Sequence, residues 1–148
     1  MILDDKKKEV NQFQLCRYFK EQDNKYKLRK EREISLNQVQ NMYSYVMSMR
    51  WVTHGAAPHE LCITENNVRK VAQKYNFHSD VVDQLCAESQ IDGKESFINW
   101  ISFLALSIAV CSHSAKETLV NCLTLFSVDG IIGNIDDLEQ VLLFYAGI

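Results

Sequence analysis

The chain has 148 residues, of which 47% are hydrophobic and 24% charged, with five Gly and one Pro. This length and composition exclude a disordered or fibrous protein and fit one domain or two small lobes. The formal charge of −3 is unevenly distributed, because residues 1–33 carry ten basic and seven acidic residues, whereas residues 34–148 carry six and twelve. We therefore expect an acidic body with a mildly basic N-terminal arm.

Several classes of partner and location are disfavoured by local composition. The basic run at residues 25–32 contains Glu31 and has acidic neighbours, so we predict no nucleic-acid binding. The first ten residues lack the apolar stretch of a signal peptide. The longest apolar run, residues 97–111, is shorter than the roughly 17–25 residues of a membrane span. Five cysteines without close pairing favour a reducing compartment, so the predicted location is cytoplasmic.

The N-terminal region, residues 1–34, is predicted to be a basic helix and a connector. Apolar residues at three-residue steps indicate a helix over residues 6–20, namely Val10, Phe13, Cys16 and Phe19. The second region, residues 35–148, is predicted to be one helical domain. It opens with a capping box at Ser35 and Gln38, from which a helix runs to about residue 50.

Four further helices are predicted to open at Thr64, Ser79, Ser114 and Asp136. The helix after Ser114 carries Leu119, Val120, Leu123 and Phe126. The run at residues 97–111 is predicted to be a helix buried on most sides. The C-terminal segment 141–148 stays apolar to its end, and we expect it to pack against the helix at residues 115–126. These patterns predict an all-α fold around a buried central helix.

The C-terminal stretch LFSVDGIIGNIDDLEQVL (residues 125–142) fits half of a twelve-residue calcium-binding loop. Such a loop has oxygen ligands at positions 1, 3, 5 and 12, a Gly at position 6, and an aliphatic residue at position 8 that pairs with a neighbouring loop. If Ile135 is position 8, Gly133 is position 6 and Glu139 position 12. Ligand positions 1, 3 and 5 then hold Val128, Gly130 and Ile132. One inserted residue would instead give Ser127, Asp129 and Ile131.

Two upstream segments share this arrangement. Ile98 at position 8 puts Ser102 at position 12, and Ile63 at position 8 puts Asn67 at position 12. The three isoleucines are separated by 35 and 37 residues, which is close to one helix-loop-helix with its linker.

On these residues, residues 35–148 resemble a degenerate array of three EF-hand units. The stretch KETLVNCLTLFSVDGIIGNIDDLEQVL is similar to the calcium-silent EF-hand modules that precede catalytic or TLD-type domains in larger eukaryotic proteins. The resemblance implies an EF-hand-like fold, but the lost ligand positions mean that it does not carry calcium sensing over. We predict no cofactor.

The predicted function is non-catalytic, calcium-independent protein–protein interaction. EF-hand pairs hold an amphipathic helix of a partner, or an adjacent domain, in an apolar groove between their helices. The predicted groove residues are Met42, Met47, Trp100, Phe103, Leu142 and Phe144.

Other interpretations of the sequence remain open. A weak calcium sensor would use Asp129 and Glu139. A helical effector or viral-type Bcl-2-like inhibitor would use residues 97–111 as its central helix. A zinc site at His54, His59 and Cys62 lacks a visible fourth ligand, and a nucleophilic Cys62 or Cys111 lacks any surrounding catalytic motif, so we predict that the chain is not an enzyme.

Overall fold

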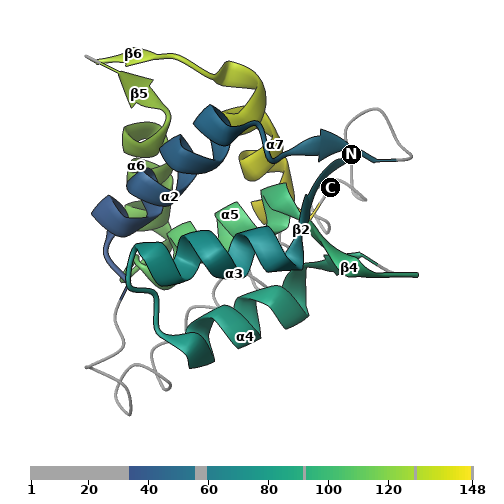
Figure 1. Ribbon diagram of the computed structural model, residues 1–148. Coiled ribbons are helices and arrows are strands. Elements are labelled where there is room, and N and C mark those ends of the chain that lie inside the picture. Colours follow the sequence, from purple (N-terminus) through teal and green to yellow (C-terminus); the bar gives the residue numbers. More distant parts are fainter. Residues whose placement is uncertain (1–33, 56–59, 92, 129, 148) are drawn as a thin grey trace, which may run out of the picture.

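The computed structural model describes residues 34–55, 60–91, 93–128 and 130–147. In these residues the chain forms six helices, a four-stranded antiparallel sheet and a separate two-stranded hairpin. The prediction of an all-α fold is therefore wrong, and the architecture is mixed α/β (Figure 1). The predicted helix at residues 6–20 and the connector after it lie outside the described residues.

The helices, labelled in Figure 1, are α2 (Leu36–Met49), α3 (Glu65–Lys74), α4 (Ser79–Ser89), α5 (Trp100–Val110), α6 (Ala115–Leu125) and α7 (Ile135–Tyr145). The four-stranded sheet has the order β1-β2-β4-β3 and consists of β1 (Thr53–His54), β2 (Leu61–Thr64), β3 (Gln90–Ile91) and β4 (Lys94–Asn99). The hairpin pairs β5 (Ser127–Val128) with β6 (Ile131–Ile132).

The strands could not be predicted from the sequence because they are very short. β1 and β3 have two residues each, and the longest strand, β4, has six. Alternation of buried and exposed side chains cannot be recognised over two residues. Only the central pairing, between β2 and β4, joins segments about 35 residues apart, whereas β1 and β3 pair with strands close to them in the chain.

Pairing of β2 with β4 joins the two upstream segments that resemble calcium-binding loops, those around Ile63 and Ile98. They pair antiparallel with Ile63 opposite Ile98, which is the pairing expected of position 8 in two neighbouring loops. A helix begins two residues after each isoleucine, and the residue between them caps it. The Thr64 hydroxyl accepts a hydrogen bond from the Asn67 amide at 3.2 Å, and the Asn99 side chain accepts one from the Ser102 amide at 3.0 Å. The same local structure is thus built twice.

The third predicted loop is different. Ile135 is the first residue of α7 and is 64% exposed, and the strands before it pair only with each other in the described residues. Asn134, and not Asp136, caps α7 by accepting a hydrogen bond from the Asp137 amide at 3.1 Å. The third unit therefore does not use Ile135 to join a neighbouring loop.

The helix α5 is the centre of the core, as predicted. Every residue of α5 except Ser102 is buried, and the helix packs against α2, α4, α6 and α7. Its one deeply buried hydroxyl, that of Ser107, donates to the Phe103 carbonyl at 2.7 Å, so this polar atom is satisfied inside the helix. Against the prediction for residues 141–148, α7 packs mainly against α5 and less against α6.

No helix in the described ranges is both long and apolar enough to cross a membrane. The longest, α2, has 14 residues. A membrane span needs about 20 residues.

Candidate interaction surface

The helix α6 is apolar on two opposite sides. Its inward side buries Thr118, Cys122 and Leu125. The outward side carries Leu119, Val120 and Leu123, whose side chains are 45%, 51% and 50% exposed. Leu119 and Leu123 are one helical turn apart and therefore share a face. We call these three residues the α6 outer face.

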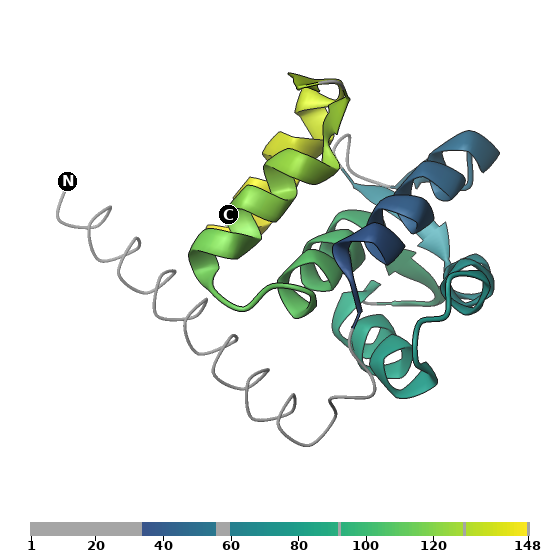
Figure 2. The same cartoon turned by 90° about the vertical axis from the view of Figure 1, so that its left-hand side faces the viewer.

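Exposed apolar residues are concentrated in the unit formed by α6, the hairpin and α7. Figure 2 shows α6 and α7 side by side, joined at one end by the β5–β6 hairpin. Ile131 on β6 and Ile135 on α7 are 72% and 64% exposed. In the described residues, six of the eight large exposed apolar side chains belong to this unit: Leu119, Val120, Leu123, Ile131, Ile135 and Leu142. Single exposed apolar residues are common, whereas six in one unit make that unit the candidate interaction surface.

The hairpin between α6 and α7 is set by local backbone chemistry. Gly130 has a φ of +79°, which a residue without a Cβ atom adopts at little cost. The Gly133 amide then donates to the Phe126 carbonyl at 2.9 Å, which joins the end of the hairpin to the end of α6. The connection is therefore short and tied at its base.

A polar network fixes the start of α7 to α2. The Tyr43 hydroxyl donates to Asp137 Oδ2 at 2.9 Å, and Asn134 Nδ2 donates to the same oxygen at 2.8 Å. Burial and the negative charge of Asp137 raise the pKa of Tyr43 above its ordinary value. Burial also raises the pKa of Asp137, and the charge of Asp136 adds to this, while the hydrogen bonds from Tyr43 and Asn134 oppose it. The network positions the hairpin and α7 relative to the core.

This network predicts a pH dependence of stability. Because the pKa of Asp137 is higher in the folded chain than its unfolded value of about 3.9, the folded state binds the proton more tightly. The resulting stabilisation is complete below the unfolded pKa and is lost as the pH rises through the folded pKa. The melting temperature of the wild type minus that of an Asp137→Asn variant should therefore be larger at pH 4 than at pH 7. Thermal unfolding of both proteins at the two pH values measures this. A difference that is constant, or that favours wild type more at pH 7, contradicts it.

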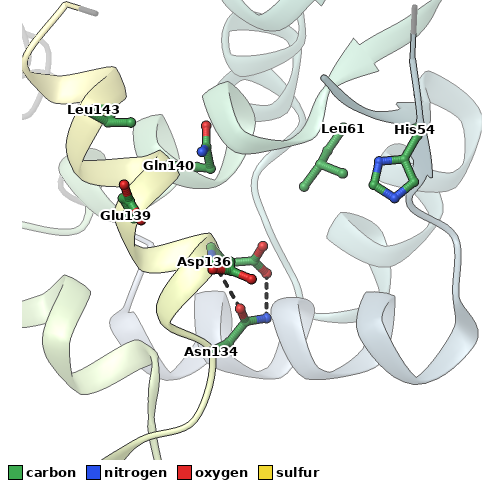
Figure 3. Close-up of a pocket in the computed structure, with 8 residues that line it drawn as sticks. His54, Leu61, Asn134, Asp136, Glu139, Gln140 and Leu143 are labelled. Atoms are coloured by element: carbon green, nitrogen blue, oxygen red, sulfur yellow. Dashed lines mark hydrogen bonds between the residues drawn. The ribbon is translucent and has the colours of Figure 1, made fainter. Parts of the chain in front are cut away.

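An acidic depression lies beside this network (Figure 3). It has a volume of about 730 Å³ and lies between the β1–β2 hairpin, which contributes His54 and Leu61, and the first turns of α7. Its acidic residues are Asp136, Asp137 and Glu139. In the described part of the chain, no three His, Cys, Asp or Glu side chains are grouped to hold a metal ion. The depression is open to solvent, and its three carboxyl groups contribute negative charge to the α6–α7 unit.

The six predicted groove residues do not come together as an open groove. Met42, Trp100 and Phe103 are fully buried in the core, and Met47 and Phe144 are partly buried against it. Leu142, at 37% exposed, is the only one of the six classed among the exposed apolar side chains. The space between the helices is therefore filled by these side chains themselves, and their predicted role in binding remains a prediction.

The α6 outer face was not singled out from sequence. In the chain, Leu119, Val120 and Leu123 look like an ordinary core stripe, because Thr118 and Cys122 on the other side are less hydrophobic. The one signal was that apolar residues occur on both sides of α6, since Leu125 and Phe126 follow the inward side. The packing of the inward side therefore leaves the apolar residues of the other side exposed.

The candidate metal and nucleophile residues have ordinary structural surroundings. His54 is exposed, Cys62 is buried, and His59 lies outside the described residues. Burial raises the pKa of the Cys111 thiol to about 12, so this thiol is protonated and poorly nucleophilic at neutral pH.

No protein-family model, curated protein or solved structure matches the chain.

Proposed function

We propose that this protein is a non-catalytic interaction module with a pair of EF-hand-like loops, which binds a basic amphipathic helix of a protein partner without calcium. The observation that carries the proposal is the α6 outer face, where three large aliphatic side chains are about half exposed on a helix whose other side is already packed. Helices with an apolar stripe bind such faces through residues at i, i+3 or i+4 and i+7.

The register of β2 and β4 supports the EF-hand-like part of the proposal. Ile63 lies opposite Ile98, and each is followed by one capping residue and then a helix. In an EF-hand loop, position 8 pairs between loops whether or not a metal is bound. Retention of this pairing without the ligands is what a calcium-silent module requires.

The charge of the α6–α7 unit supports a basic partner. Residues 115–147 contain one basic residue, Lys116, and five acidic residues, which are Glu117, Asp129, Asp136, Asp137 and Glu139. Electrostatic complementarity selects partners and accelerates their association. A helix with Lys or Arg beside its apolar stripe therefore fits this unit better than an acidic one.

Binding of a synthetic peptide tests the proposal. The probe is a Leu/Lys peptide of roughly 18 residues with helical spacing of its leucines, and the control is a shuffled peptide of the same composition. We expect saturable binding to the full chain that Leu123→Asp weakens at least about tenfold, or 1.4 kcal/mol. The matched substitution Met49→Asp, at another exposed apolar side chain, should leave the dissociation constant unchanged. Equal binding of the shuffled peptide, or no effect of Leu123→Asp, would overturn the proposal.

Calcium should bind neither paired loop with the affinity of a sensor. Position 12 holds Asn67 and Ser102, which cannot supply the bidentate carboxylate of an EF-hand, and positions 1 and 3 of the second loop are Ile91 and Gly93. Titration calorimetry should show no binding heat from micromolar to low-millimolar calcium, and peptide binding should be the same with calcium or a chelator. A stoichiometric event below about 10 µM, the sensor range, contradicts this prediction.

A further inference from the structure

We propose that, in the chain on its own, the α6 outer face is covered by the chain's own N-terminal segment, residues 6–20, which a partner helix must displace. This inference rests on the proposed function in taking the α6 outer face as the binding surface. It identifies the segment that occupies this surface when no partner is present. Release of that segment would regulate the access of a partner to the α6 outer face.

The segment has the chemistry that the α6 outer face requires. Its sequence predicts an amphipathic helix with the apolar stripe Val10, Phe13, Cys16 and Phe19. Residues 6–20 contain five basic residues and one acidic residue, Glu9. Their net charge of +4 is opposite to the net charge of −4 of residues 115–147, which contain one basic and five acidic residues. The one strongly basic amphipathic segment of the sequence thus matches the acidic unit with the exposed apolar face.

The chain is long enough to make this contact. Ile34, the first described residue, is buried at the start of α2, and α2 itself packs against α6. The 13 residues 21–33 separate the segment from Ile34, and a chain of this length can span up to about 43 Å when extended. A 15-residue helix is about 22 Å long, whereas the 11 residues of α6 extend about 16 Å. The segment can therefore reach α6 and cover its whole length.

Net charge favours the N-terminal segment over a second copy of the chain as the occupant of the α6 outer face. Pairing two α6 outer faces would bring together two units that each carry a net charge of −4. Juxtaposed like charges oppose association, whereas the N-terminal segment neutralises the unit. Covalent attachment also raises the effective concentration of the segment to about the millimolar range.

Disulfide trapping in the full chain tests the contact, because the apolar stripe already contains Cys16. A Val120→Cys substitution places a thiol on the α6 outer face, and Gln73→Cys places the control thiol at an exposed position of α3. Cys62, Cys86 and Cys122 are buried and should react slowly. Under mild oxidation we expect an intramolecular bond between Cys16 and position 120 to form at least ten times faster than one between Cys16 and position 73. Adding Phe13→Asp should remove most of this difference.

Two results would overturn the inference. Equal rates for positions 120 and 73 would show no preferred contact, and bonds that join two chains would assign the α6 outer face to a dimer. The peptide assay keeps this test distinct from that of the proposed function. If the segment covers the face, Phe13→Asp should tighten binding of the Leu/Lys peptide several-fold. Peptide binding that depends on Leu123 but is unaffected by Phe13→Asp would reject the segment as occupant while leaving the proposed function in place.

Discussion

Replacement of Leu104 by Ala should lower the free energy of unfolding by about 2–5 kcal/mol. Leu104 is fully buried in the middle of α5, the helix against which α2, α4, α6 and α7 pack. Truncation removes apolar contacts and leaves a cavity that the surrounding helices cannot close without losing their own contacts. Chemical denaturation of the full chain measures the change.

The same substitution at a partly exposed leucine gives the matched control. Leu142 is 37% exposed, so Leu142→Ala removes much less buried area and should cost no more than about 1 kcal/mol. Equal losses at the two positions, or no loss at Leu104, would mean that α5 is not the centre of the core.

Deletion of residues 141–148 should cost about 3 kcal/mol or more. The deletion removes the second half of α7, in which Val141 is fully buried and the Tyr145 hydroxyl donates to the Ala105 carbonyl of α5. Cys122 Sγ of α6 lies 4.0 Å from the Tyr145 hydroxyl oxygen, so Tyr145 contacts both neighbouring helices. Loss of a buried aliphatic side chain and of a half-buried aromatic residue with its hydrogen bond accounts for the magnitude.

A shorter deletion and hydrogen exchange test the reason for this loss. Removing the chain from Gly147 onward, where Gly147 is exposed, should change stability little. In the intact chain the amides of residues 142–145 should exchange slowly, because they lie in a helix docked on α5. Fast exchange of these amides, together with an unchanged stability of the long deletion, would contradict docking.

Local chemistry predicted several features correctly. The Ser35–Gln38 capping box and the Thr64 cap are present, because a side-chain oxygen satisfies a nearby amide whatever the rest of the fold does. Burial of α5 was predictable because its sequence offers no polar face. Other caps were missed by one or two residues: His78 precedes the predicted Ser79, and Asn134 precedes the predicted Asp136.

Sequence periodicity did not predict which side of α6 is buried, because both sides of this helix carry apolar residues. Leu119, Val120 and Leu123 are more hydrophobic than Thr118 and Cys122, yet the latter pair is buried and the former three are exposed. Which residues are buried depends on which side of α6 meets α5 and α2. Met42, Trp100 and Phe103, which were predicted for a groove, are members of the buried core cluster, and their predicted role in binding stays a prediction.

The sequence by itself determined the starts of several helices, the burial of α5, the division of charge between the arm and the body, and the 35-residue spacing that brings Ile63 opposite Ile98. Each of these depends on groups close together in the chain or on overall composition. Only the tertiary structure decided that four short segments pair into a sheet and that Ile135 does not pair with Ile63 or Ile98. It also decided that the α6 outer face is exposed. These outcomes depend on competition among distant segments for the same buried surface and the same backbone partners, and local sequence does not record which segment succeeds.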